Sequence, residues 1–391
     1  MEKKPPLMEI EDARLVICDR LKPRPPVSVA LSHSLGRVIA RPLHAPFDFP
    51  AFDQSAMDGY ALASLHPGPH PLLEESSPPN GGPDLPSGAR RVATGFPLPN
   101  WACCVVPQEN CGIVAGAVTV DQGFSLKNEL HIRRRGGAFA TGTEVLPIGT
   151  VVTPGVIGLA ASCGCAELSV HQAVDSLHVV TGAELITPPT APRVGKVYDS
   201  NGPMMAALLL ERRISSAQVR TGDDADLLRR TLEDFTGELI LISGGSGPGQ
   251  QDHTAAALTA SGYEIHISGV RSRPGKPLIF ATRGDQAAFG LPGNPLSQWV
   301  CFQVFVQTAL DRWNGLPLAG FVLADGEEGW RPQGDGRPTW TPAKVHHTNG
   351  RTTVRPIPWQ HSGDLLPLAG ANALLFGAPD PITQKINTLL L

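Results

Sequence analysis

The chain has 391 residues and a formal net charge of −4. This length leaves room for roughly two to four domains, and a weakly acidic chain gives no electrostatic reason to expect binding to nucleic acid or to an anionic membrane surface. A polar start, the absence of an apolar run long enough to cross a membrane, and seven Cys without metal-site spacing predict a cytoplasmic protein with reduced thiols.

The N-terminal half predicts one helix followed by a β-rich module. Residues 8–21 carry apolar side chains at helical spacing, and the prolines that begin at Pro23 end that helix. Short apolar stretches broken by Gly and Pro over residues 46–142 favour a small β-barrel or sandwich. Residues 143–172 return to strand and helix signals.

The C-terminal half predicts an α/β domain over residues 173–317 and a small β module over 318–391. Buried strands are predicted at 176–180 and 238–243, followed by Thr181-Gly182 and by a Gly-rich loop from Gly244. Ser200 or Asn201 is predicted to cap a helix over 203–213, and a second helical run covers 254–260. Repeated strand–loop–helix units imply a mainly parallel sheet with its ligand at the carboxyl ends of the strands.

Two rigid turns stand out between Arg271 and Phe305. Pro274 and Pro277 bracket Lys276 with fixed φ, so its ammonium is presented from a stiff turn. In the second turn Gly293 allows a close backbone approach, and Asn294 precedes a helix predicted from about Leu296. A cation and a helix N-terminus on neighbouring turns predict an oxyanion or phosphate site.

Seven motifs in a fixed order carry a resemblance to a known family. They are DQSAMDGYA (53–61), ATGFP (93–97), TGAEL (181–185), VYDSN (197–201), ISGG followed by GQQDH (242–253), RPGKP (273–277) and GLPGNPLS (290–297). Together they resemble the molybdopterin molybdenumtransferase family, which includes the gephyrin E-domain, over essentially the whole chain.

The resemblance implies an α/β plus β, multidomain fold. An elongated linking domain is expected from 23–45 and 143–172, with an inserted β-rich domain at 46–142. The central, mainly parallel α/β molybdopterin-binding domain is expected from 6–22 and 173–317, and a C-terminal small β-barrel from 318–391. The family is typically a head-to-tail homodimer that completes its active site across subunits, so a homodimer is expected.

The reaction that the resemblance implies is the insertion of molybdate into adenylylated molybdopterin, with Mg²⁺-dependent release of AMP. It requires a pocket for a tetrahedral oxyanion and carboxylates for the cation. Expected catalytic residues are Asp252, Asp58 and Glu184, with Asp252 and Glu184 on the metal. Expected substrate-binding residues are Arg273, Lys276, Ser297, Arg337, Ser362, Thr94, Asp199, Gly244, Gly245 and Asn294.

Simpler interpretations remain open for single residues. Asp252 is also a suitable helix N-terminal residue, Asp199 could start a helix, and Arg337 or Ser362 could be a solvated surface group or a cap. The expected partners are a second copy of the chain, a molybdopterin adenylyltransferase and molybdoenzyme acceptors, without nucleic acid or membrane.

Two departures from the family pattern open alternatives. Pro248 removes a backbone donor from the Gly-rich loop, and Ala138 stands where the family commonly has an acidic residue. They motivate a catalytically weakened paralogue that binds molybdopterin nucleotide as a carrier or scaffold. A clustering protein with the same fold is a second alternative, and tungstate is an alternative to molybdate.

Overall fold

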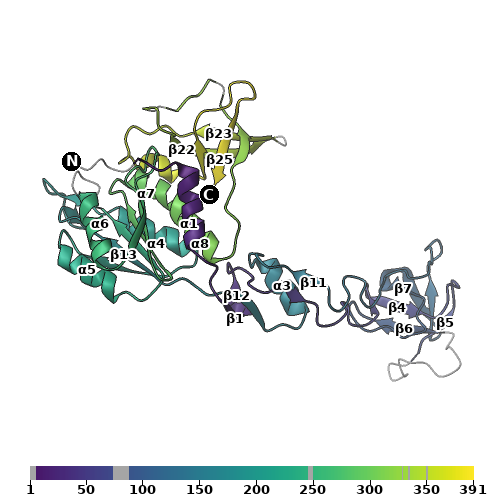
Figure 1. The fold of residues 1–391 in the computed structure, drawn as a ribbon. Coiled ribbons are helices and arrows are strands. Elements are labelled where there is room, and N and C mark those ends of the chain that lie inside the picture. Colours follow the sequence, from purple (N-terminus) through teal and green to yellow (C-terminus); the bar gives the residue numbers. More distant parts are fainter. Residues whose placement is uncertain (1–5, 74–87, 245–249, 328, 333–334, 349–350) are drawn as a thin grey trace. The chain divides into compact units, whose positions relative to one another are not determined.

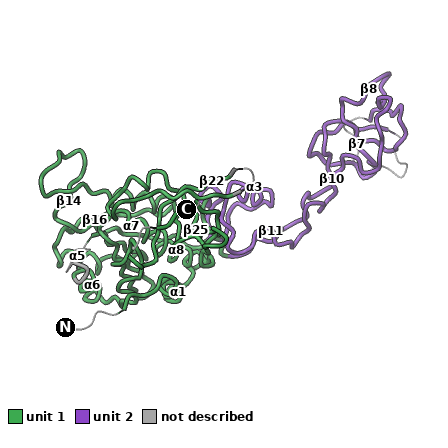
Figure 2. The backbone as a smooth tube through the Cα atoms, turned by 90° about the horizontal axis from the view of Figure 1, so that it is seen from above, with its two compact units in different colours: residues 1–27, 36–40, 170–391 green, residues 28–35, 41–169 purple. Residues whose placement is uncertain are grey.

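The computed structural model describes residues 6–73, 88–244, 250–327, 329–332, 335–348 and 351–391, without the side chains of residues 250–252, 348 and 351. The chain forms two compact units, coloured separately in Figure 2: unit 1 is residues 1–27, 36–40 and 170–391, and unit 2 is residues 28–35 and 41–169. Within the described residues, no helix combines the length and apolarity that a membrane crossing needs.

A six-stranded sheet forms the centre of unit 1 (Figure 1). Its strands, in spatial order, are β16 (Ser216–Arg220), β13 (Ser176–Val180), β17 (Leu239–Ser243), β20 (Gln286–Leu291), β19 (Ile279–Arg283) and β18 (Glu264–Ser268). The first four run parallel, whereas β19 and β18 are antiparallel to their neighbours. The sheet is therefore mainly parallel, as predicted, with an antiparallel edge.

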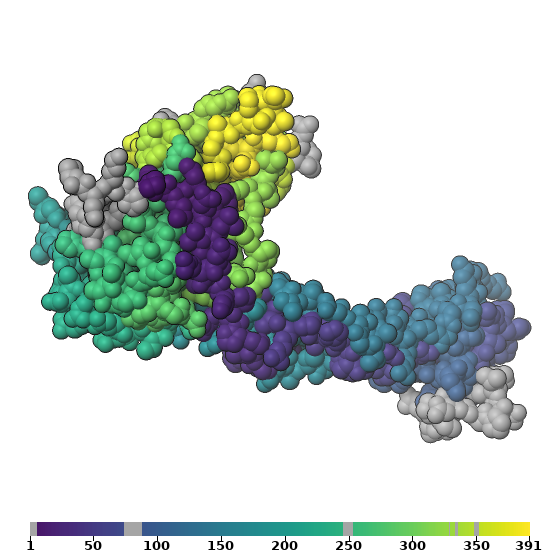
Figure 3. Space-filling view, in the orientation of Figure 1, coloured from purple at the N-terminus to yellow at the C-terminus, as the bar shows by residue number. Residues whose placement is uncertain are grey.

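Helices cover both faces of this sheet. They are α1 (Ile10–Arg20), α4 (Asn201–Glu211), α5 (Ala225–Asp234), α6 (Gln250–Ala260), α7 (Pro295–Cys301), a π-helical segment (Phe302–Val306) and α8 (Gln307–Trp313). Successive strand residues point to opposite faces, so Ile240 packs with α5 and α6, and Leu241 packs with α1, α4, α7 and α8. Both faces are buried, which explains the continuous apolar run of β17. Figure 3 shows α1, in purple, lying over the surface of unit 1.

A closed five-stranded barrel completes unit 1 and confirms the predicted C-terminal β-barrel. Its strands are β21 (Val322–Asp325), β22 (Trp340–Thr348), β23 (Arg351–Pro356), β24 (Ala373–Phe376) and β25 (Lys385–Leu390). Trp340 and Leu374 are fully buried in the same hydrophobic core as α7 and α8. Because that core is continuous, the barrel and the α/β part hold each other in place.

Unit 2 is built from short antiparallel strands, as its Gly- and Pro-rich sequence predicts. Its sheets are β3 (Gln54–Ser55) with β10 (Ile132–Arg133), β2 (Leu43–His44) with β11 (Glu144–Leu146), the order β6 (Ala89–Val92), β4 (Gly59–Leu62), β7 (Cys104–Pro107), and the order β5 (His70–Pro71), β9 (Ala117–Val120), β8 (Cys111–Val114). Helix α3 (Pro154–Ser162) starts where Thr153 accepts a hydrogen bond from the Val156 N–H (3.3 Å).

The unit boundaries fall within β1 (Pro26–Ala30) and β12 (Glu167–His171), and unit 2 also holds the short α2 (Leu31–Ser34). Each unit contains a fully buried thiol, Cys301 on α7 in unit 1 and Cys104 on β7 in unit 2. Burial raises the pKa of Cys104 to about 12 and also raises the pKa of Cys301 strongly. The four domain boundaries expected from the family stay a prediction.

Candidate functional site

The turns that the sequence singled out in unit 1 all lie at one edge of the sheet. Val180, Ser243 and Leu291 end three parallel strands and are in register with one another. Because β19 is antiparallel to β20, its first residue, Ile279, lies at this same edge. The segments after β13, β17 and β20 and the turn before β19 therefore gather at the carboxyl edge of the sheet, where α/β proteins bind ligands.

Lys276 is exposed on a turn whose preceding residues, Pro274 and Gly275, are buried. The Ser272 hydroxyl, which is fully buried, donates to the carbonyl oxygen of Pro274 (2.7 Å). Gly275 has a φ of +109°, and a Cβ at this position would lie 3.0 Å from the Sγ of Cys301 on α7, so the turn packs on α7 only because it carries glycine. The Lys276 ammonium makes no hydrogen bond or ion pair with any residue that the structure describes, and is free to meet an anion.

The second turn connects the sheet to the barrel. The side-chain amide of Asn294 donates to the Ser362 hydroxyl (2.6 Å), and the Leu296 N–H donates to the Ser362 carbonyl oxygen (3.0 Å). Asn294 therefore bonds across to the barrel and does not cap α7 with its side chain. Ser297 is 5% exposed within α7. The structure thus brings Asn294 and Ser362 together, whereas Ser297 is buried in the first turn of α7.

The two predicted arginines differ in their surroundings. The guanidinium of Arg273 lies over the ring of Trp359, 5.1 Å from its centroid. Arg337 forms a two-point ion pair with Asp335 (Nε to Oδ1 2.9 Å, Nη2 to Oδ2 2.5 Å) and also donates to the carbonyl oxygen of Ser272 (3.2 Å). The hydrogen bonds from Arg337 hold the pKa of Asp335 well below its usual range. The negative charge of Asp335 therefore already balances the positive charge of Arg337.

The predicted acidic residues of unit 1 differ in burial and in hydrogen bonding. Asp199 is buried, where its Oδ1 accepts from the Gly202 N–H (2.8 Å) and its Oδ2 pairs with Arg220. Ser200 occupies the N-cap position of α4, as predicted, but its side chain makes no capping hydrogen bond, and the Asp199 carboxylate takes that role. Helix α4 also starts earlier than the predicted 203–213, because the Asp199 cap comes before Asn201.

Glu184 is exposed, and its carboxylate lies close to the Cα of Gly182 without a hydrogen bond to a described residue. Asp252 belongs to the first turn of α6, which starts before the predicted residue 254, but its side chain lies outside the described part, as does Gly245. Gly244 is described: it has a φ of +106°, and a Cβ there would lie 2.4 Å from the Oγ1 of Thr181. Only glycine fits this close approach.

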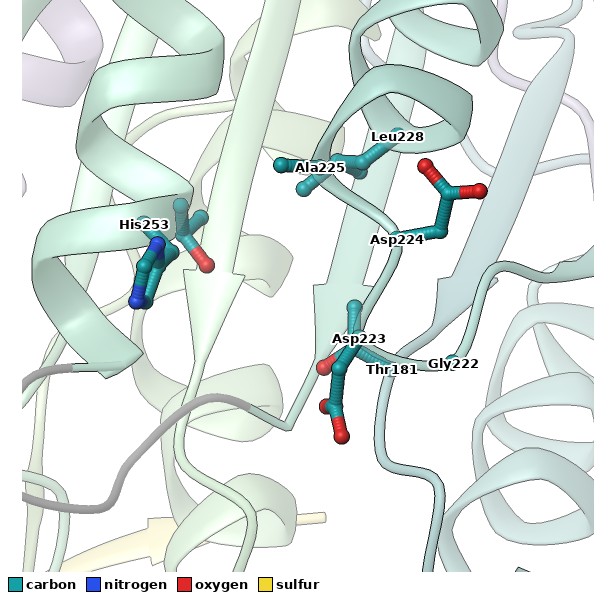
Figure 4. A pocket seen from close by; sticks show the side chains of 8 residues that line it. Thr181, Gly222, Asp223, Asp224, Ala225, Leu228 and His253 are labelled. Atoms are coloured by element: carbon teal, nitrogen blue, oxygen red, sulfur yellow. The ribbon is translucent and has the colours of Figure 1, made fainter.

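A pocket of about 120 Å³ at the carboxyl edge adds residues that the sequence reasoning missed (Figure 4). It is lined by Thr181, Gly222, Asp223, Asp224, Ala225, Leu228, His253 and Thr254. The Oδ2 of Asp223 accepts a hydrogen bond from the Ala183 N–H (3.4 Å), which joins this pocket to the Glu184 turn. Asp224 caps α5 by accepting from the Leu227 N–H (2.8 Å). Sequence reasoning missed Asp223 because Gly222-Asp223-Asp224 is equally typical of an ordinary turn followed by a helix cap.

Unit 2 holds the other two predicted residues together. The Oδ1 of Asp58 accepts hydrogen bonds from both the N–H (2.7 Å) and the hydroxyl (2.9 Å) of Thr94. These bonds hold the pKa of Asp58 below its usual range, so it is ionised at neutral pH. Phe96, two residues after Thr94, and Phe52, six residues before Asp58, are 63% and 48% exposed.

The described residues contain no group of three or more His, Cys, Asp or Glu arranged to hold a metal ion. The fold itself defines a class: a multidomain protein with an α/β ligand-binding part, a β-rich part and a small closed barrel.

Comparison with known proteins names that class. Residues 8–164 match the MoeA N-terminal region (domain I and II), residues 178–312 the probable molybdopterin binding domain, and residues 331–380 the MoeA C-terminal region (domain IV). The chain is 32% identical to molybdopterin molybdenumtransferase 2 of Mycobacterium tuberculosis (strain H37Rv), over 80% of this chain and 81% of the relative. It is 28% identical to molybdopterin molybdenumtransferase of Staphylococcus aureus (strain MRSA252), over 96% and 92%.

The fold is likewise similar to that of a molybdopterin biosynthesis MoeA protein from Pyrococcus horikoshii, with a TM-score of 0.74, 23% identity, and coverage of 98% of this chain and 97% of the other. The chain belongs to the molybdopterin molybdenumtransferase family, a family of transferases in molybdenum cofactor biosynthesis.

Proposed function

We propose that this chain inserts molybdate into adenylylated molybdopterin and releases AMP in a Mg²⁺-dependent step. The observation that carries the proposal is the Lys276 turn. Its ammonium is exposed and has no partner among the described residues, on a turn packed against α7. Arg273, also at this turn, supplies a second cation, which suits a doubly charged tetrahedral oxyanion.

The carboxylates at the same edge of the sheet suit the nucleotide end of the substrate. Mg²⁺ is held in proteins by one or two carboxylates together with phosphate oxygens and water, so no complete protein cage is required. Glu184 and Asp223 offer such oxygens on turns joined by a hydrogen bond, and Asp252 is the third candidate. Mg²⁺ bound there would neutralise charge on the pyrophosphate. The chain's own residues orient the phosphates, and backbone N–H groups at the carboxyl edge of the sheet are the candidate donors.

Asp58 and Thr94 fit the active site of a homodimer. We propose that Asp58 of one subunit faces the Lys276 turn of the other. The exposed Phe96 and Phe52, close in sequence to Thr94 and Asp58, support an interface at this end of unit 2, since exposed aromatic patches mark interaction sites. A cytoplasmic location, supply of the substrate by a molybdopterin adenylyltransferase, and delivery of the product to molybdoenzymes complete the proposal.

The test is incubation of the purified protein with adenylylated molybdopterin, molybdate and Mg²⁺. We expect AMP release and molybdenum bound to the pterin product, both dependent on Mg²⁺. Tight binding of the nucleotide without AMP release would reject the proposal in favour of the carrier alternative. A parallel reaction with tungstate decides whether the site discriminates between these dianions.

A further inference from the structure

Ser243 is the last residue of β17 and makes buried contacts on two sides of the sheet edge. Ser243 is 1% exposed, and its hydroxyl contacts the side-chain amide nitrogen of Gln298 and the Nε2 of His178. Gln298 on α7 and His178 on β13 are 0% and 1% exposed. Three polar side chains thus form a hydrogen-bonded chain, and Asp199 and Arg220 act electrostatically on His178.

The chemistry of the three groups sets one of these two hydrogen bonds. An amide nitrogen only donates, so the Ser243 hydroxyl accepts from Gln298. Toward the Nε2 of His178 the hydroxyl donates or accepts according to the tautomer of the imidazole. His178 is neutral at neutral pH, because burial lowers its pKa to about 4.

The backbone of Ser243 makes a third connection. Its carbonyl oxygen accepts from both the N–H (2.9 Å) and the hydroxyl (3.1 Å) of Thr181. The next residue, Gly244, packs so closely on Thr181 that a Cβ would lie 2.7 Å from the Thr181 carbonyl oxygen. One residue therefore connects the turn that leads to Glu184, the start of the Gly-rich loop, and the helix that carries Ser297.

This arrangement costs stability. The Nδ1 of His178 and the Oε1 of Gln298 are buried without a hydrogen-bond partner among the described residues, and an unsatisfied buried polar group lowers stability because it has lost its bonds to water. The neighbouring residues of the same strands are Val, Leu and Ile, so apolar side chains would pack here at lower cost. A polar chain retained at such a cost calls for a reason beyond packing.

We propose that Ser243 is a positioning residue that holds the Thr181–Glu184 turn and α7 in a fixed mutual arrangement for the reaction. The inference rests on the proposed function for its kinetic test. Glu184 and Ser297 lie on these two different segments, and Ser243 is hydrogen-bonded to both segments, through Thr181 and through Gln298.

The kinetic test compares Ser243→Ala with Ser243→Thr, which keeps a hydroxyl, and with the matched control Ser176→Ala. Ser176 is also buried, but its hydroxyl donates to the carbonyl oxygen of Ser215 (3.0 Å) at the opposite, amino end of β13. Misplacing a reacting group by about 1 Å costs on the order of 100-fold. We therefore expect Ser243→Ala to lower kcat for AMP release roughly 10- to 100-fold with a KM for the nucleotide changed less than about threefold, and Ser243→Thr to recover most of the loss. A kcat within about twofold of that of Ser176→Ala overturns the proposal.

A second measurement does not depend on activity. Amide hydrogen exchange is followed at residues 181–186 and 296–298 in Ser243→Ala and in Gln298→Met, which keeps the length of the side chain and removes the donor. Faster exchange at both segments in these variants, and at neither in Ser176→Ala, supports the connection. Unchanged exchange overturns it. If the parent chain releases no AMP, the proposed function fails, and this exchange result still decides whether Ser243 holds the segments together.

Discussion

The buried His178 makes a definite prediction about stability and pH. Burial lowers the pKa of His178 from its ordinary 6.5 to about 4 in the folded chain, with Asp199 raising it and Arg220 lowering it by smaller effects. Below pH 6.5 the unfolded chain binds a proton that the folded chain does not accept until about pH 4. Stability from His178 is therefore fully present above pH 6.5 and is lost as the pH falls toward 4.

The size of the effect follows from the pKa difference. One pKa unit corresponds to about 1.4 kcal/mol, so the full loss is about 3 kcal/mol, and the loss between pH 7 and pH 5 is about 2 kcal/mol. His178→Gln keeps an acceptor for the Ser243 hydroxyl and cannot be protonated in this range. We expect the free-energy difference between the parent and His178→Gln to shift by about 2 kcal/mol over these two pH units.

Urea unfolding followed by tryptophan fluorescence is the assay. Trp101 is the one tryptophan of the sequence that belongs to unit 2, so the other tryptophans report on unit 1, which contains His178. His346→Gln, which removes an exposed histidine on β22, is the matched control and should follow the parent. Parallel stability curves for the parent and His178→Gln would show that His178 is not held neutral by burial.

Three further predictions concern the proposed reaction. Lys276→Ala should weaken molybdate binding by about 1.5–3 kcal/mol, roughly 10- to 150-fold, without loss of folding. The control Lys22→Ala removes the same charge beside the β19–β20 turn, at the opposite edge of the sheet, and should leave binding unchanged. Equal molybdate affinities of the two variants would refute the anion site. Asp252→Asn should lose Mg²⁺-dependent AMP release and keep nucleotide binding, and AMP release at the parent rate would reduce Asp252 to a helix-terminal residue. Mixing inactive Asp58→Asn and Lys276→Ala subunits should restore up to about half of the sites in mixed dimers; a monomer by light scattering, or no recovery after verified subunit exchange, would contradict the shared site.

The central strands were predictable because they are buried on both faces. Residues 239–242 of β17 and 287–291 of β20 are continuous apolar runs, a pattern typical of a parallel sheet covered by helices on both sides. Strand β13 was predicted as well, although Ser176 and His178 interrupt its apolar residues. The edge strand β16, by contrast, reads Ser-Ala-Gln-Val-Arg and is half exposed, so its sequence resembles a loop. Missing this strand also hid Asp223, because a carboxylate is placed at the carboxyl edge only once its strand is known.

Contacts between distant residues were beyond sequence reasoning. The bond between Asn294 and Ser362 joins residues 68 positions apart, and no spacing rule indicates it. The pair of Arg337 with Asp335 is local, but whether an arginine meets a neighbouring carboxylate or a ligand depends on backbone geometry that the motif does not contain. Asp199 shows the same limit, since capping α4 and binding substrate both favour an aspartate at that position.

The two buried cysteines make it possible to measure which of the two units unfolds first. Cys301 and Cys104 are 0% exposed, one in each unit, and both thiols have raised pKa values, so neither forms a reactive thiolate while its unit stays folded. An alkylating reagent added during slow denaturation would therefore mark each thiol at the moment its surroundings open. Peptide mapping of the two labelled cysteines would report the order in which the units lose their structure, and no residue has to be substituted to introduce a labelling site.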